Sequence, residues 1–280
     1  MSTGETARGL LELTRPMNAI AAAVLTFIGA FVAGGVPGLS LEVAAAVAAT
    51  GLAVGAGNAI NDYFDREIDR INQPDRAIPR GAVTPRGALW FSAVLFLAAV
   101  ALALLLPVLA IAIAVINLIA LVTYTEYFKG LPGLGNALVA YLVGSTFLFG
   151  AAAVGELQSV VVLALLAGTA TLTREIIKDV EDIDGDREEG LNTLPIAIGP
   201  RRALWVAAVL LVAAALASPI PFVLEQMGVE YLAVVLPAVV IMVYASYRSF
   251  GDPTAGQTLL KYGMFLAAVA FIVGRGAIVV

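Results

Sequence analysis

The chain alternates long apolar stretches with short polar ones, and the length of the apolar stretches limits its possible folds more than any other feature. Nine apolar segments are bounded by Gly, Pro or charged residues. They cover residues 16–34, 41–61, 87–106, 108–125, 134–154, 158–178, 201–222, 230–248 and 258–279. A helix needs about 20 apolar residues to cross the roughly 30 Å hydrocarbon core of a bilayer. The pattern predicts an all-α, polytopic membrane protein with nine transmembrane helices, the first segment being a span and not a cleaved leader.

Composition excludes several other classes of protein. Hydrophobic residues make up 60% of the chain and charged residues 13%, whereas a soluble domain is nearer half apolar and a quarter charged. A soluble fold of 280 residues could not bury that much apolar surface. The chain has no Cys and no His, which excludes disulfides, thiolate nucleophiles, the usual zinc sites and imidazole acid–base chemistry. Its chemistry must rely on carboxylates, amides, hydroxyls and cations.

The distribution of basic residues predicts the orientation in the membrane. Loops on the cytoplasmic side are enriched in Lys and Arg. With nine spans, every Lys and Arg except Arg275 falls on the side of the N-terminus. We therefore predict that the N-terminus and the long connections 62–86 and 179–200 are cytoplasmic, and that the C-terminus is outside. Pro37, Glu156 and Glu225 are expected to face outward.

The acidic residues are concentrated in two segments that repeat each other. Thirteen of the 21 Asp and Glu residues lie in 62–75 and 175–189. The pattern D-x-x-D-x-x-x-D followed by Arg occurs in both, at an offset of 117 residues. The repeated aspartates are Asp62, Asp65 and Asp69 in the first copy and Asp179, Asp182 and Asp186 in the second. We define the first acidic motif as residues 58–81 and the second as 174–195, within a single domain covering 1–280.

The spacing within each motif indicates a metal site. At 100° per residue, Asn58 and the three aspartates of the first motif fall within about 60° of one helix face. Glu175 takes the place of Asn58 in the second motif, although Gly185 can end that helix before Asp186. Carboxylates stacked in this way repel each other, and desolvation near a membrane helix end increases the repulsion. A single motif of this kind could consist of solvent-exposed charges beyond a helix end, without a ligand. Two such motifs at matched positions favour a metal site.

A hard divalent cation would neutralise these carboxylates. Mg²⁺ prefers oxygen ligands and commonly takes one or two carboxylates together with phosphate oxygens. We therefore expect Mg²⁺, as two ions, to be held by the six aspartates and to bind a diphosphate. Asn58 and Asn61 could add oxygen ligands or donate to phosphate. The metal would stabilise the departing diphosphate, and a dry apolar cavity would protect the resulting carbocation from water.

Five cationic residues near the motifs have two interpretations each. Arg15 either reaches a phosphate or marks the membrane interface. Arg174 and Lys178, one turn apart at the end of a span, either bind substrate or pair with neighbouring carboxylates. Arg76 and Arg80 can bind an anionic substrate or lipid head groups.

Both motifs resemble those of the UbiA prenyltransferase superfamily, over essentially the whole chain. The matching residues are Asn61, Asp62, Asp65, Asp69, Asn72, Pro74, Arg76, Ile78, Pro79 and Gly81 in the first motif, and Asp179, Glu181, Asp182, Gly185, Asp186 and Gly190 in the second. Tyr124 and Lys129 are similar to the family's intermediate motif, although topology alone can explain Lys129. The resemblance implies a central cavity open laterally to lipid, Mg²⁺ and a prenyl diphosphate donor. It also implies catalytic roles for Asp62, Asp65, Asp179, Asp182 and Tyr124, and substrate binding by Lys129.

Within the superfamily, residues 174–182 most resemble archaeal enzymes of ether-lipid synthesis. These enzymes transfer a geranylgeranyl group from geranylgeranyl diphosphate to the sn-2 hydroxyl of geranylgeranylglyceryl phosphate. The resemblance thus implies a lipid-like, phosphorylated glycerol ether as acceptor. Ala77 and Arg80 stand where Pro and Ser are common in the family. The resemblance therefore does not predict which residues of the loop around them contact the acceptor.

Two other functions remain compatible with the sequence. An aromatic or chlorin prenyltransferase would share the donor site but take a different acceptor. An ion-coupled transporter also uses repeats and intramembrane carboxylates, but near the midplane on broken helices, whereas these carboxylates lie at span ends. We expect the lipid bilayer as a partner and no nucleic acid.

Overall fold

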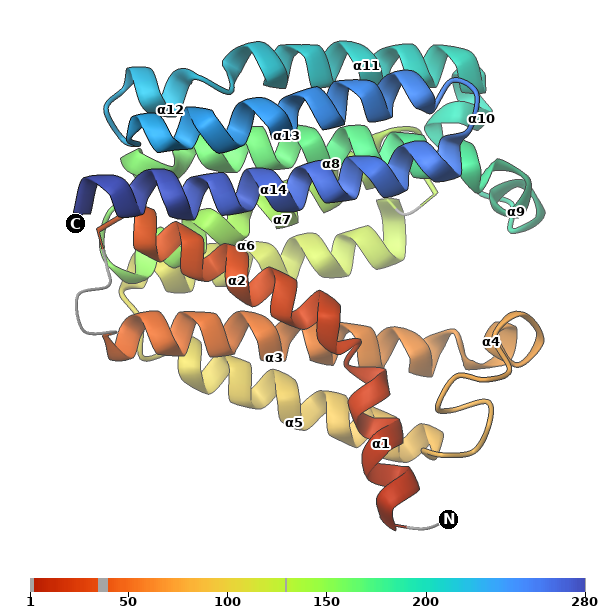
Figure 1. Cartoon of the computed structure of the whole chain (residues 1–280). Coiled ribbons are helices and arrows are strands. Elements are labelled where there is room, and N and C mark those ends of the chain that lie inside the picture. Colours follow the sequence, from red (N-terminus) through yellow and green to blue (C-terminus); the bar gives the residue numbers. More distant parts are fainter. Residues whose placement is uncertain (1–2, 35–39, 129, 280) are drawn as a thin grey trace.

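The computed structural model describes residues 3–34, 40–128 and 130–279, which form a bundle of long helices lying roughly side by side (Figure 1). The α-helices are α1 (Thr3–Leu13), α2 (Pro16–Val32), α3 (Leu41–Phe64), α4 (Arg66–Asn72), α5 (Pro85–Ala103), α6 (Val108–Thr123), α7 (Leu134–Ala153), α8 (Val161–Glu181), α9 (Ile183–Glu188), α10 (Leu194–Ile198), α11 (Pro200–Ala217), α12 (Ile220–Val223), α13 (Val229–Arg248) and α14 (Pro253–Val279). A π-helical turn, η1 (Tyr124–Phe128), follows α6, and a 3₁₀ turn, η2 (Gln158–Val160), precedes α8. Those ranges contain no strand, so the predicted all-α class is confirmed.

Each predicted apolar segment corresponds to a helix, but not every helix is long enough to span a membrane. Among the described residues, seven helical segments have the length and hydropathy of a membrane span. An eighth results if α1 and α2, which meet at 47°, are counted as one broken span. Helix α6 is apolar but has only 16 residues, short of the roughly 20 that a perpendicular span needs. The chain is an integral membrane protein, and the count of nine spans stays a prediction.

Local sequence signals explain where several helices begin or break. Ser40 caps α3 by accepting a hydrogen bond from the backbone N–H of Val43, and Thr84 caps α5 in the same way. The segment predicted as 201–222 is interrupted around Pro219, which has no N–H to donate, so it forms α11 and the short α12. Helix α14 starts at Pro253, five residues earlier than predicted.

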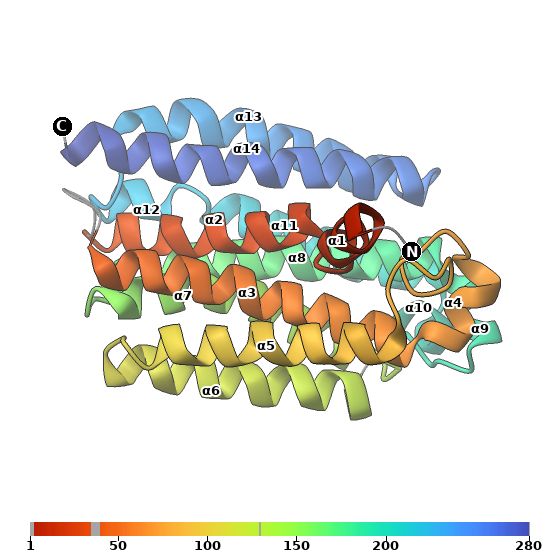
Figure 2. The same ribbon diagram turned by 90° about the horizontal axis from the view of Figure 1, so that it is seen from below.

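The helices pack in layers, with α5 and α6 at one edge of the bundle and α13 and α14 at the other (Figure 2). Helices α2 and α7 approach each other most closely where small residues meet. A Cβ atom on Gly150 would collide with the carbonyl oxygen of Thr26, and one on Gly29 with that of Phe147. Close backbone approach at small residues is typical of membrane helix pairs. This contact places α7 in the middle of the bundle.

The two acidic motifs have the same backbone form. Helix α3 ends at Phe64 and α4 begins at Arg66, so Asp65 interrupts the helix for one residue. Asp182 interrupts α8 and α9 in the same way. Gly185 does not end the second helix before Asp186, because Gly185 lies inside α9. The i to i−4 backbone bonds run through both interruptions, which keeps the aspartates on one side.

Candidate active site

The two acidic motifs lie at the same end of the bundle, although they are far apart in sequence. Helices α4 and α9, which follow the interruptions, project from that end together with α10 (Figure 1). The C-terminus lies at the opposite end (Figure 1). The structure therefore brings the repeated aspartates to one region of the molecule, as the repeat predicts.

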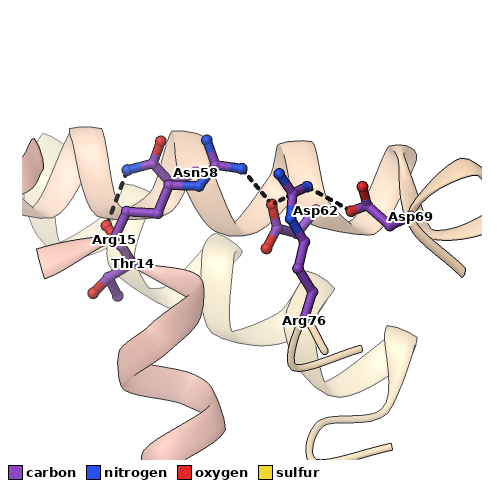
Figure 3. A network of polar contacts seen from close by, with 6 residues as sticks. All are labelled: Thr14, Arg15, Asn58, Asp62, Asp69 and Arg76. Atoms are coloured by element: carbon purple, nitrogen blue, oxygen red, sulfur yellow. Dashed lines mark hydrogen bonds and ion pairs between the residues drawn. The ribbon is translucent and has the colours of Figure 1, made fainter. Parts of the chain in front are cut away.

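Arginines bond to two of the three repeated aspartates of the first acidic motif. The Nη2 atom of Arg15 donates to Oδ1 of Asp62 at 2.7 Å, and Nη1 of Arg76 donates to Oδ2 of Asp69 at 2.7 Å (Figure 3). The same Nη1 atom lies 3.5 Å from Oδ1 of Asp62. Both aspartates are 5% exposed. Charge-assisted bonds of this kind are about twice as strong as neutral ones, so Arg76 bridges two carboxylates that would otherwise repel each other.

A break between α1 and α2 positions Arg15. Its backbone has φ 47°, in the left-handed region, which costs roughly 1–2 kcal/mol for a residue with a Cβ. Asn58 stabilises the break, because its Nδ2 atom donates to the carbonyl oxygen of Thr14 at 2.9 Å (Figure 3). The structure places Arg15 in contact with Asp62, and neither of its two interpretations, a phosphate contact or a marker of the membrane interface, had included this bond. Asn61 lies one residue before Asp62 and lines a cavity.

Neutral groups hold the second acidic motif. The Nδ2 atom of Asn136 donates to Oδ2 of Asp179 at 2.8 Å, and Oγ1 of Thr193 donates to Oδ2 of Asp186 at 3.1 Å. Asn136 lies near the start of α7 and is buried. The sequence patterns predicted neither of these donors. A lone Asn in an apolar segment was the available signal for Asn136, since polar residues in membrane spans are commonly functional.

The cations of the second motif bond to glutamate and glutamine. Nη1 of Arg174 lies 2.9 Å from Oε1 of Glu175, and Nζ of Lys178 lies 3.7 Å from Oε2 of the same residue. Arg174 also donates from Nη2 to Oε1 of Gln257 on α14 at 3.0 Å. Oε2 of Glu181 is buried and has no hydrogen-bond partner. This region therefore keeps acidic oxygens that no arginine neutralises among the residues described.

Asp65 and Asp182, the residues at the interruptions, are the more accessible aspartates. Asp65 is half-buried, and its carboxylate makes no ion pair or side-chain hydrogen bond within the described part of the chain. Asp182 is exposed. Partial desolvation nevertheless raises the pKa of Asp182, the Lys178 charge opposes the shift, and Glu181 and Asp186 add to it. A cation arriving from solvent would meet these two carboxylates first.

The donor atoms of the site fit Mg²⁺, but only with ligands from outside the chain. Within the described ranges, no three acidic residues lie close enough to form a ready-made metal cluster. Mg²⁺ does not require one, because it commonly combines one or two carboxylates with phosphate oxygens and water. The available donors are all hard oxygens, and the unpartnered Oε2 of Glu181 adds one more. The arrangement suits a metal that arrives with a phosphorylated substrate.

Tyr124 and Lys129 are the residues that resemble the family's intermediate motif. Tyr124 begins the π-helical turn η1 and interacts electrostatically with Lys178, Glu175 and Asp179, so it belongs to the second acidic motif's surroundings. π-Helical turns are frequent at functional sites. Lys129 lies outside the described residues.

Arg80 is not directed at the aspartates. It donates from Nη1 to the carbonyl oxygen of Asp75 at 2.6 Å and pairs through Nη2 with the carboxylate of Glu12 on α1. It therefore ties the loop after α4 to α1.

Described residues of the bundle line two apolar cavities. One, of about 260 Å³, is bounded by α3, α5, α6 and α7. The other, of about 530 Å³, is bounded by α2, α7, α8, α11, α13 and α14. The family resemblance implies a central cavity, and the two cavities described here have no lining residue in common.

Comparison with known proteins relates this fold and site to one family. The model of the UbiA prenyltransferase family matches residues 22–269. A digeranylgeranylglyceryl phosphate synthase of Natronomonas pharaonis is 66% identical over 276 residues, which is 98% of this chain and 99% of the relative. A solved structure described as digeranylgeranylglyceryl phosphate synthase has a TM-score of 0.83 at 36% identity, over 97% of this chain and 99% of the other. A UbiA homolog from Archaeoglobus fulgidus bound to GPP and Mg²⁺ has a TM-score of 0.73 at 19% identity, over 97% and 100% of the two chains, and shares the fold.

Proposed function

We infer the reaction of this chain from the premise that it belongs to the UbiA prenyltransferase family. It transfers the geranylgeranyl group of geranylgeranyl diphosphate to the sn-2 hydroxyl of geranylgeranylglyceryl phosphate. The bond between C1 of the donor and the diphosphate oxygen breaks, and the diphosphate leaves with the electron pair. The sn-2 oxygen bonds to C1 and releases its proton, forming the second ether of archaeal membrane lipids. The observation that carries this conclusion is the 66% identity over 98% of the chain with a synthase of that name.

Mg²⁺ is the proposed cofactor, as two ions. The relative from Archaeoglobus fulgidus binds Mg²⁺ with a prenyl diphosphate, and the hard oxygen donors of both acidic motifs suit this ion. We propose that the six repeated aspartates hold it; they are Asp62, Asp65, Asp69, Asp179, Asp182 and Asp186. When bound, Mg²⁺ would stabilise negative charge on the leaving diphosphate.

The chain's own cations and amides would position the substrates. Arg15 and Arg76 already point at Asp62, where a diphosphate held by the first motif would lie within their reach. Asn58 and Asn61 would contact the same donor, and Arg174 and Lys178 would act beside the second motif, next to Tyr124. The apolar cavities would keep water from the allylic cation. We propose Lys129 and Arg80 as further substrate contacts on the grounds of family resemblance and charge.

We propose that the whole chain, 1–280, acts as one domain in the cell membrane with nine spans, and that both acidic motifs face the cytoplasm. The positions of Lys and Arg support this orientation. The chain has no Cys, so Gln73→Cys and Glu225→Cys variants each carry a single thiol. An impermeant thiol reagent applied to intact cells should label Glu225→Cys and leave Gln73→Cys unlabelled, and the reverse pattern would overturn the orientation.

A direct assay tests the reaction. Purified protein in lipid nanodiscs is incubated with Mg²⁺, labelled geranylgeranyl diphosphate and one acceptor at a time: geranylgeranylglyceryl phosphate, 4-hydroxybenzoate or a chlorophyllide. We expect the ether product with the first acceptor alone. Prenylation of the aromatic or chlorin acceptor in its place would support the alternative prenyltransferase, and the absence of any transfer would refute the proposal.

A further inference from the structure

The cation that bridges the first acidic motif, Arg76, lies on a loop and not on a helix. Residues 73–84 connect α4 to α5, and we call them the Arg76 loop. We propose that Glu12 on α1 is a positioning residue for the reaction: by pairing with Arg80, it holds this loop, and with it the guanidinium of Arg76, at the first acidic motif. The inference rests on the proposed function and adds to it a role for the N-terminal helix.

The Arg76 loop packs against α1 without space for a larger residue. A Cβ atom on Gly9 of α1 would lie 2.8 Å from Cγ2 of Val83 and 3.1 Å from the Cβ atom of Ala82. One turn later on α1, Leu13 is fully buried and belongs to the same apolar cluster as Ala77 and Val83. Close packing at two successive turns means that a displacement of α1 would also displace the loop.

Glu12 joins α1 to the polar side of the loop. Its carboxylate pairs with Nη2 of Arg80, and the two side chains are 35% and 32% exposed. Glu12 also pairs with Arg8 on its own helix, whose side chain is 79% exposed. Ion pairs that are partly shielded from water are screened less than exposed ones. The pair with Arg80 is therefore the stronger of the two contacts, and it is the one that reaches the loop.

Arg80 is connected directly to Arg76. Its backbone N–H donates to the carbonyl oxygen of Arg76 at 3.1 Å, and its Nη1 atom donates to the carbonyl oxygen of Asp75 at 2.6 Å. Both the backbone and the side chain of Arg80 thus bond to the stretch of chain that carries Arg76. The guanidinium of Arg76 in turn bonds to the aspartates of the first motif (Figure 3). Polar contacts of 3.5 Å or less therefore lead from Glu12 to that motif.

Helix α1 reaches the same motif by a second route. Arg15, two residues after the end of α1, donates to Oδ1 of Asp62, the oxygen that Arg76 also contacts (Figure 3). The position of α1 therefore sets the separation of two guanidinium groups on one carboxylate. A diphosphate held by the first motif would meet both groups. A displaced Arg76 would weaken a contact made both before and during transfer, which raises the donor KM and leaves kcat unchanged.

Substitutions that remove one charge of the pair test the proposal at saturating Mg²⁺. Glu12→Gln and Arg80→Gln should each raise the KM for geranylgeranyl diphosphate by about threefold, because a partly exposed ion pair contributes little more than this. The KM for geranylgeranylglyceryl phosphate and kcat should not change. Arg8→Gln is the matched control: it removes the ion pair that Glu12 makes within α1, and it should leave both KM values as they are.

Double variants show whether Glu12 acts through Arg80 and Arg76. Residues that act as a unit have non-additive effects, so the variant with both Glu12→Gln and Arg80→Gln should have the donor KM of either single variant. In an Arg76→Gln background, Glu12→Gln should have no effect, since the side chain that it positions is absent. An undiminished effect of Glu12→Gln in that background, or an equal increase in the KM of both substrates, would make Glu12 a residue of general stability and overturn the proposal.

The same measurements separate positioning from the direct substrate contact proposed for Arg80. A direct contact alone would raise the donor KM in Arg80→Gln and leave it unchanged in Glu12→Gln, which would refute the role of Glu12. The wild-type protein distinguishes this failure from failure of the proposed function. No ether product from geranylgeranyl diphosphate and geranylgeranylglyceryl phosphate refutes the function, whereas product with an unchanged donor KM in Glu12→Gln refutes the positioning role alone.

Discussion

The two acidic motifs share a backbone but differ in how their charge is balanced. Both α3 and α8 are interrupted at the second aspartate and continue into a short helix. In the first motif, Arg15 and Arg76 bond directly to the buried aspartates. In the second, Asn136 and Thr193 hold the carboxylates as neutral donors. Arginines therefore bond directly to Asp62 and Asp69 of the first motif, whereas Asp179 of the second motif is bonded by a neutral amide and the nearby Lys178 pairs with Glu175.

Removal of metal should have the largest effect, because Asp179 in the second motif accepts its side-chain hydrogen bond from a neutral amide, that of Asn136, which cannot replace a cation. With excess EDTA, we expect transfer to fall to background and to return when Mg²⁺ is added. Assaying product from labelled geranylgeranyl diphosphate before and after Mg²⁺ is restored measures this. Sustained turnover in excess chelator would contradict the assignment of a metal to either motif.

Replacing one aspartate in each motif should reduce kcat by a similar factor in both variants but reduce the free energy of unfolding by different amounts. Both Asp62→Asn and Asp179→Asn should lower kcat by about 10²-fold or more, because each removes one charge that stabilises the leaving group's metal. Asp62→Asn leaves Arg15 without its charged partner and removes one of the two carboxylates that Arg76 contacts, and it should cost about 1–3 kcal/mol of stability. Asp179→Asn keeps a hydrogen-bonding oxygen for Asn136 and should cost less.

Thermal unfolding in detergent measures the difference between these two variants. Glu67→Gln is the matched control, since Glu67 is an acidic side chain on α4 that is 65% exposed, and it should change neither property. Equal melting temperatures for Asp62→Asn and Asp179→Asn would remove the contrast between the motifs.

The sequence predicted the common features of the two motifs and not their difference. Apolar length predicted the helices, and the repeated spacing predicted that the aspartates lie at matching helix ends. Both depend on local periodicity, which a single sequence contains. The interruptions at Asp65 and Asp182 were not predicted, because a one-residue change in helix geometry depends on the packing around it.

The hydrogen-bond partners of the site residues come from distant parts of the chain. Asn136 is 43 residues from Asp179, and Gln257 is 83 residues from Arg174. Spacing along one helix cannot identify such pairs, because they depend on how helices pack. The same holds for Arg15, for which the sequence left two interpretations open. Its contact with Asp62 follows from a left-handed residue between α1 and α2, which no local propensity of Arg predicts.

A smaller effect is expected from the neutral donor of the second motif. Asn136→Leu removes the bond that orients Asp179, and the loss of such a supporting partner commonly costs 10–100-fold in metal affinity. The Mg²⁺ concentration that gives half-maximal rate should rise by about this factor. Asn192→Leu is the control, because Asn192 is exposed and its side chain makes no hydrogen bond within the described residues. An unchanged Mg²⁺ requirement in Asn136→Leu would show that Asp179 does not need this donor.

The smallest effect should have the opposite sign. Arg76 bonds to Asp62 and Asp69, and it therefore competes with Mg²⁺ for their oxygens. Arg76→Gln should lower the Mg²⁺ concentration for half-maximal rate, by no more than about fivefold, because a pair whose arginine is a third exposed is worth about 1 kcal/mol. Arg70→Gln is the matched control: its guanidinium pairs with Glu67 at the surface, where both side chains are more than half exposed, and the Mg²⁺ requirement should not change.

Arg15→Gln should act in the same direction as Arg76→Gln, which guards against an effect of local misfolding in either variant. If charge balance distinguishes the two motifs, Asn136→Leu and Arg76→Gln shift the Mg²⁺ requirement in opposite directions in the same titration. A shift in the same direction for both would mean that the arginines assist metal binding, and the two motifs would then differ in sequence but not in their dependence on an external cation.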